Sequence, residues 1–178
     1  MTVILDPGGV RDPYTLPLST RRGTHIPNLP RQEWSPNSLK NSIEAYRGDY
    51  PDAALRSITA IYNCLGLPFA ARRTWIEPDH TQMILMEDGY TKLPAADHAQ
   101  IGDIVVYRHA GEDTHVGVLI RIDDPLSVHR KLFVLSKWGP FGEYTHPIDK
   151  VPPLFGKPDE FWTDRRLESD ISRSTTRN

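Results

Sequence analysis

The chain has 178 residues, of which 38% are hydrophobic and 25% are charged, and this composition predicts one folded domain. Its formal net charge of −2 leaves no basic excess to neutralise a phosphate backbone, which argues against nucleic-acid binding. Because Cys64 is the only cysteine, an internal disulfide is excluded and a reducing compartment is favoured.

The N-terminal stretch has neither a basic start nor a long apolar run, so it predicts no signal peptide. No apolar run is long enough for a transmembrane helix, and we expect a cytoplasmic protein, with leaderless export as the alternative. Residues 1–36 contain six prolines with arginines among them. Because proline removes amide donors and fixes φ, this stretch predicts an extended arm that packs on the domain, blocks a cleft or binds a partner.

Four helices are expected after the arm. Ser35 and Pro36 are typical of a helix start, and Asp52 can cap the second helix. Pro68 is accepted in a helix only within the first turn, so the third helix places Cys64 at its N-terminus. The four predicted helices cover residues 36–46, 53–62, 64–75 and 80–87.

From residue 102 onward the pattern changes to strands rich in valine, isoleucine and leucine, separated by polar turns. Prolines after the strands predict an irregular wrap toward Trp162, and the tail at 166–178 is expected to be disordered. The strands are expected at 103–107, 115–122, 131–137 and 142–145. The sequence therefore predicts an α+β fold in a domain at 37–165, with N-terminal helices packed on an antiparallel sheet.

Cys64 is the candidate nucleophile. A helix N-terminus supplies unpaired N–H groups and partial positive charge, which lower a cysteine pKa and can hold an oxyanion. Gly66, two positions on, would let a substrate approach the backbone closely. The alternative interpretation of Cys64 is a small buried hydrophobic side chain beside Leu65 and Leu67.

His115 is the candidate base, since it begins an alternating apolar strand and is followed by Val-Gly-Val. A neutral imidazole can take the thiol proton and later protonate a leaving group. The alternative is a capping or surface histidine. No two of the histidines and the cysteine have the short spacing of metal ligands, so neither a metal nor another cofactor is expected.

Three segments in this order resemble the signature of NlpC-type cell-wall peptidases and the related CHAP amidases. They are Tyr-Asn-Cys at 62–64, Gly-Asp-Ile-Val-Val-Tyr at 102–107 and His-Val-Gly-Val at 115–118. The resemblance covers about residues 53–146 and implies a papain-like fold in which Cys64 faces His115. It also implies that Tyr62 donates to the oxyanion, with a core position as the alternative.

The third catalytic member is left open by the residues. The strand at 131–137 resembles the one that carries this member, but it offers Ser136 or Lys137 where the family has His, Asn, Gln or Glu. A charged lysine has no acceptor for the imidazole N–H, so Ser136 is preferred. Hairpin pairing would place either residue opposite His115. Glu143 and His146 are the second choices.

The leading hypothesis is a cysteine hydrolase that cleaves an amide bond in a peptide, an isopeptide or a peptidoglycan stem peptide. Cys64, His115 and Ser136 would carry the reaction. Trp138, in an aromatic and glycine-rich turn, would bind the substrate, or would pack as core.

The second hypothesis is a weak or inactive member of the same superfamily that binds a protein or peptide. The family usually has Asp before the cysteine and Ser-Gly after it, whereas this chain has Asn63 before it and Leu-Gly after it. Together with the weak third member, these departures support the binding hypothesis. Trp138, Phe141 and the arm would then form the contact surface.

Overall fold

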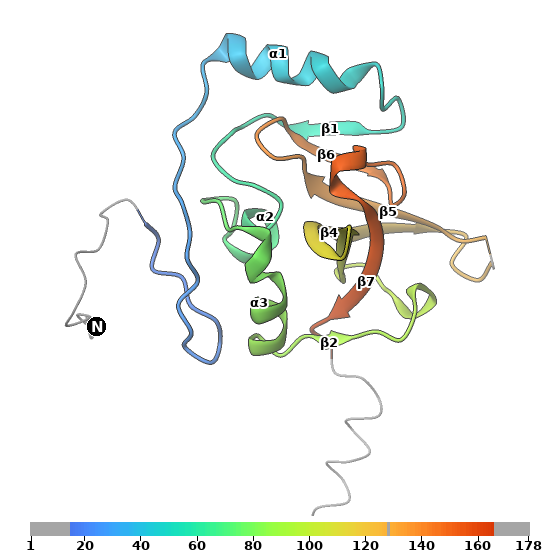
Figure 1. The fold of residues 1–178 in the computed structure, drawn as a ribbon. Coiled ribbons are helices and arrows are strands. Elements are labelled where there is room, and N and C mark those ends of the chain that lie inside the picture. The colour runs from blue at the N-terminus through green and yellow to red at the C-terminus, as the bar shows by residue number, and fades with distance from the viewer. Residues whose placement is uncertain (1–14, 128, 166–178) are drawn as a thin grey trace, which may run out of the picture.

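The computed structural model describes residues 15–127 and 129–165, which form one seven-stranded antiparallel sheet with few helices (Figure 1). This mixed architecture confirms the predicted α+β class. The strands are β1 Ala54–Ser57, β2 Thr91–Lys92, β3 Ile104–His109, β4 Glu112–Asp123, β5 Lys131–Lys137, β6 Glu143–Pro147 and β7 Lys157–Thr163, in the order β1-β6-β5-β4-β3-β7-β2. The helices are α1 Pro36–Arg47, α2 Gly66–Phe69 and α3 Thr81–Glu87, with 3-10 turns at Pro78–His80, Ala96–His98 and Pro153–Phe155.

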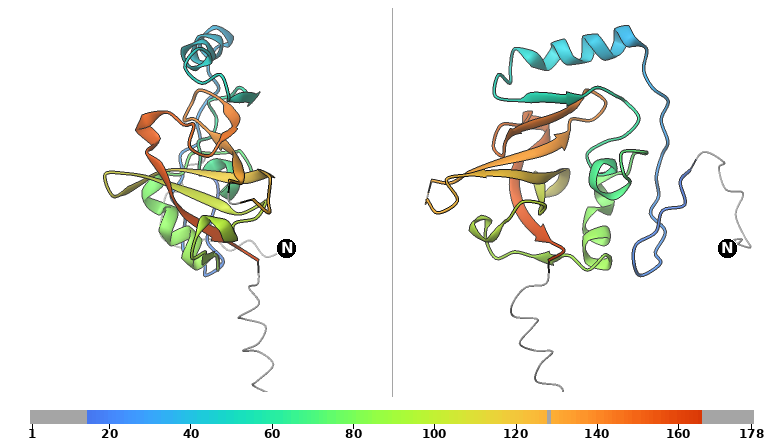
Figure 2. Two further views of the ribbon diagram at one scale, coloured as in Figure 1. Left: turned by 90° about the vertical axis from the view of Figure 1, so that its right-hand side faces the viewer. Right: turned by 180° about the vertical axis from the view of Figure 1, so that it is seen from behind.

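The sheet has a core on each face, because side chains alternate along a strand. Val106 and Val116 point to the side on which α2 and α3 pack, and we call this side the helix face (Figures 1 and 2). Tyr107 and Leu119 point to the other side, which we call the far face. Phe155, from a 3-10 turn, belongs to the far-face core.

Several predicted elements are confirmed. The first helix begins after Ser35, whose hydroxyl accepts a hydrogen bond from the Ser38 N–H at 3.2 Å. The predicted helix at 80–87 is α3, and the four predicted strands are β3, β4, β5 and β6. The described part of the arm, residues 15–35, contains no helix and packs on the domain, where Leu29 forms a β-bridge with Trp75 and Ile26 is buried.

The predicted helix at 53–62 is wrong, because this segment contains strand β1. Ala54, Leu55 and Ser57 pair with β6 at the edge of the sheet. The chain after β1 is held by the arm, since the Glu33 carboxylate accepts hydrogen bonds from the Thr59 hydroxyl and the Ala60 N–H. These long-range partners outweigh a helical spacing of apolar residues.

The predicted helix at 64–75 is also wrong in length, since α2 ends at Phe69. Ala71 and Arg72 have φ of 48° and 63°, which turns the chain back on itself. The Thr74 carbonyl then lies directly against Gly66. If the helix continued to residue 75, the Thr74 carbonyl could not contact Gly66.

Strand β7 was not expected, since its prolines predicted an irregular wrap. β7 pairs with β3 along most of its length, but β2 pairs only with Thr163 and Trp162. Pro158 therefore lies where β7 has a single neighbouring strand, a position that tolerates a missing N–H. Among the described residues no helix is long and apolar enough to cross a membrane. The predicted disordered tail at 166–178 lies outside the described residues.

Candidate functional site

The structure does not bring Cys64 and His115 together. Cys64 belongs to the core on the helix face, together with Val116. His115 is the strand neighbour of Val116 and so points to the far face, where its ring stacks on Phe155 at a centroid distance of 4.1 Å. Tyr107 meets the same ring edge-on at 5.3 Å.

No hydrogen bond joins the imidazole of His115 to the thiol. Both ring nitrogens of His115 are buried and have no hydrogen-bond partner among the described residues. Burial, and then the nearby His146, lower the pKa of His115 well below its ordinary value, so the ring is neutral at physiological pH. The catalytic role of this residue pair stays a prediction, and the sheet lies between its two members.

Cys64 itself is sealed in the helix-face core, with 5% of its surface exposed. Burial raises the pKa of its thiol to about 11, although backbone N–H groups, that of Val116 foremost, and the charge of Lys137 act in the opposite direction. The following helix α2 has four residues and gives little macrodipole. The thiol is therefore neutral at physiological pH.

Ser136, predicted to orient His115, orients a different histidine. It pairs with Gly117 in the sheet, and its hydroxyl lies 2.8 Å from Nε2 of His146. Nδ1 of His146 faces the Pro147 carbonyl at 2.7 Å and must donate to it, so Nε2 accepts from Ser136. The Ser136 oxygen in turn accepts from the Trp138 indole N–H at 3.1 Å. This chain of bonds is a fully satisfied network on the far face.

Lys137, the alternative to Ser136, lies on the same face of the sheet as Cys64. It is fully buried, and its ammonium donates to the Gly139 carbonyl and lies 5.3 Å from the ring centroid of Tyr62. Burial lowers the pKa of Lys137 to about 8, and the negative charge of Glu143 acts in the opposite direction. A polar cluster therefore adjoins the cysteine, but it contains no histidine.

Glu143 is the anionic centre of this cluster. Its carboxylate accepts from the Tyr62 hydroxyl at 2.6 Å and from the Arg72 guanidinium at 2.8 Å. Burial and the bond to Glu143 raise the pKa of Tyr62 to about 12. The hydroxyl of Tyr62, predicted to donate to an oxyanion, is thus already committed to Glu143.

Asn63, which precedes Cys64, uses both ends of its side-chain amide. Its Oδ1 accepts from the N–H groups of Gly66 and Ile76, at 3.0 and 3.2 Å. Its Nδ2 donates to the Ile76 carbonyl at 2.7 Å. Only an amide supplies both an acceptor and a donor here, because an ionised carboxylate has no donor.

Asn63→Asp is expected to destabilise the fold by about 2 kcal/mol, since the Ile76 carbonyl loses its donor and a carboxyl group is buried. Urea unfolding of the two proteins measures the difference. Asn41→Asp, on the exposed surface of α1, is the control and should change stability little. Equal stabilities of the parent and Asn63→Asp would contradict the role of the amide.

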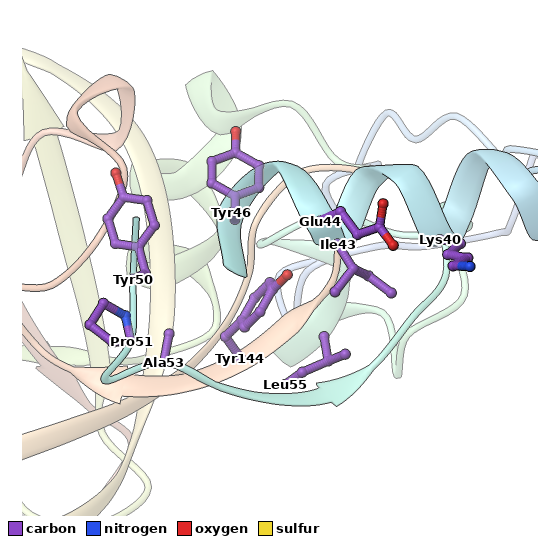
Figure 3. Close-up of a pocket in the computed structure, with 9 residues that line it drawn as sticks. All are labelled: Lys40, Ile43, Glu44, Tyr46, Tyr50, Pro51, Ala53, Leu55 and Tyr144. Atoms are coloured by element: carbon purple, nitrogen blue, oxygen red, sulfur yellow. The ribbon is translucent and has the colours of Figure 1, made fainter. Parts of the chain in front are cut away.

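An aromatic cavity of about 570 Å³ lies between α1 and the β1–β6 edge of the sheet (Figure 3). Ile43 of α1 and Leu55 of β1 point toward each other across it, and the Tyr144 ring lies beside them. Within the part of the chain that the structure describes, the buried Tyr144 hydroxyl has no hydrogen-bond partner. The lining residues are Lys40, Ile43, Glu44, Tyr46, Tyr50, Pro51, Ala53, Leu55 and Tyr144.

Trp138, predicted to bind substrate, is not among the residues that line this cavity, but it packs against three tyrosines that are. It is fully buried, stacks on Tyr144 at 4.3 Å and meets the edges of Tyr46 and Tyr50. Phe141 is half-buried between Tyr46 and Trp34. Sequence reasoning missed the tyrosines, although two of them stand four residues apart near the end of the predicted first helix.

Comparisons with known proteins give no family for this chain. No family model matches it, and neither a curated protein nor a solved structure does. Within the part of the chain that the structure describes, no three His, Cys, Asp or Glu side chains are grouped as metal ligands.

Proposed function

We propose that this chain is a non-hydrolytic binding domain that takes a protein or peptide partner into the aromatic cavity beneath α1. The observation that carries the proposal is that the cavity is bordered by exposed side chains, whereas Cys64 is sealed in the core. Cavities of this size with mostly apolar walls and a few polar groups are typical of ligand sites.

The same proposal includes a papain-like ancestry for the fold. The order of a cysteine, a short helix and a strand bearing His-Val-Gly supports it, as does the antiparallel sheet. The loss of the thiol–imidazole contact then explains why the third position could become part of a structural network around His146. A cytoplasmic location and the absence of a nucleic-acid partner belong to the same proposal.

Cys64 is expected to react with a soluble maleimide at pH 8 at least about tenfold more slowly than free cysteine, because its thiol is buried and neutral. In the His115→Ala protein at low denaturant, the rate of labelling should show no acceleration by an imidazole. Its dependence on pH should therefore be that of an ordinary thiol. Labelling faster than free cysteine, with a rate that falls in His115→Ala, would refute the non-hydrolytic assignment.

The second candidate is amide hydrolysis with Cys64 as the nucleophile and Lys137 as the base, and one observation favours it: Lys137 is buried on the same face of the sheet as Cys64. Burial lowers the pKa of Lys137 to about 8, so part of its amine would be neutral at mildly alkaline pH and could accept a proton from the thiol. This candidate predicts rapid labelling that is abolished in Lys137→Met and preserved in His115→Ala. The binding domain predicts slow labelling in both.

The binding role is tested with a displayed peptide library selected on the folded chain. Selected peptides should bind saturably and should lose affinity when the cavity wall carries a charge, as in Leu55→Arg. Ile58→Arg is the matched control, since Leu55 and Ile58 are 39% and 41% exposed but Ile58 does not line the cavity. If the selected peptides bind Leu55→Arg with unchanged affinity, the binding site lies elsewhere and the proposal is overturned.

A further inference from the structure

We infer, on the basis of the proposed binding function, that the cavity beneath α1 recognises a proline-rich segment in the extended polyproline II conformation. Tyr46, Tyr50 and Tyr144 line the cavity, and Pro51 and Leu55 add to its apolar surface. Aromatic-lined grooves are the sites that polyproline II segments use, since the segment is already ordered and brings rings to pack on rings.

The unpartnered hydroxyl of Tyr144 supports this ligand class. Tyr144 is 4% exposed, and its hydroxyl lies beside Ile43 at the cavity (Figure 3). A buried hydroxyl without a partner is costly, so a ligand that supplies an acceptor gains affinity there. Every carbonyl of a polyproline II segment is free to accept, because this conformation has no internal hydrogen bonds.

Strand addition is disfavoured as the binding mode, although β1 is an edge strand. β1 has four residues, and its pairing with β6 is irregular between Leu55 and Ser57, where Arg56 lies. Short length, an irregular register and a charged side chain are the features that keep an edge from pairing with another chain. A second copy of this chain is disfavoured for the same reason. The ligand must therefore be held by its side chains and carbonyls.

The charges of the lining argue against an anionic ligand. Lys40 and Glu44, one residue of each sign, stand one turn apart on α1. Phosphate groups and acidic motifs are recognised by clusters of arginine, and no arginine is among the lining residues whose side chains the structure describes. A neutral segment rich in proline fits the mixed charge.

The test is fluorescence anisotropy with a labelled, capped decaproline peptide and a Gly-Ser peptide of the same length, titrated with the full chain. Decaproline should bind saturably and the Gly-Ser peptide should not. Tyr144→Phe, which removes only the hydroxyl, should weaken binding about tenfold, the effect of roughly one hydrogen bond to an otherwise unsatisfied group. Tyr107→Phe is the matched control, because its hydroxyl bonds to the Ile148 carbonyl outside the cavity.

Location is tested separately with Leu55→Arg and its control Ile58→Arg. Loss of decaproline binding only in Leu55→Arg supports the inference. Failure of decaproline to bind, equal binding of the Gly-Ser peptide, or a dimer that Leu55→Arg dissociates would overturn it. A different outcome is that decaproline fails to bind while library peptides without proline bind and lose affinity in Leu55→Arg. In that case the proposed ligand class is wrong and the proposed binding function stands. If no peptide binds, both fail.

Discussion

Gly66→Ala is expected to destabilise the protein by at least about 3 kcal/mol, a large part of the stability of a domain of this size. A Cβ at position 66 would lie 1.9 Å from the Thr74 carbonyl oxygen and 3.0 Å from the Tyr62 Cβ. The carbonyl belongs to the backbone and cannot rotate away, because Trp75 is bridged to Leu29 of the arm. The glycine predicted to admit a substrate is thus required by the chain's own turn.

Urea or thermal unfolding measures this effect, with Gly48→Ala as the matched control. A Cβ at Gly48 meets no atom within 4 Å, and its φ of −80° suits any residue. We expect Gly48→Ala to change stability by less than about 0.5 kcal/mol. If the Gly66→Ala protein is as stable as the Gly48→Ala protein, the turn at 70–74 can move to make room for the Cβ. The close packing of Thr74 on Gly66 would then not contribute to stability.

Acid is expected to destabilise the fold well above the pH at which carboxylates titrate. Burial holds the pKa of His146 at about 4, against about 6.5 in the unfolded chain, and burial lowers the pKa of His115 as well. The unfolded chain therefore binds more protons in this range. The contribution of the neutral histidines to the free energy of unfolding is fully present above pH 6.5 and is lost as the pH drops toward 4. For His146 alone this loss amounts to about 3 kcal/mol.

Chemical unfolding at a series of pH values between 7 and 4 measures this loss. His146→Gln should make the profile shallower, because one of the two buried rings is gone while His115 remains. Ser136→Ala removes the hydroxyl partner of the ring but keeps the ring, so its profile should still fall with acid. A His146→Gln profile as steep as that of Ser136→Ala would assign the acid sensitivity to other groups.

Local patterns in the sequence predicted the elements that depend on their own residues. Ser35 and Pro36 identified the start of α1, and alternating apolar residues identified β3, β4 and β5. The predictions failed where a distant partner decides. The segment at 53–62 becomes β1 because β6 pairs with it, and α2 is short because Thr74 returns to Gly66.

The candidate site shows the same division. The sequence indicated five residues of interest, Tyr62, Cys64, His115, Ser136 and Trp138, and the last three lie in one connected far-face core. Cys64 lies across the sheet from these three, and Tyr62 lies in the polar cluster of Lys137 and Glu143. The cavity beneath α1 was not predicted, because its walls come from a helix, a loop and two strands that meet only in the folded chain.

What the sequence determined by itself is the order and type of the central elements, including the alternation that sends His115 and Val116 to opposite sides of β4. What the tertiary structure decided is which of those sides meets Cys64. Because side chains alternate along a strand, the sequence requires adjacent residues to point to opposite faces of the sheet. Which face meets the cysteine depends on the helices that cover it and on the strand register, and a shift of one residue would reverse it. Val116, not His115, faces the cysteine because α2 and α3 pack on the face of the sheet that carries Val106 and Val116.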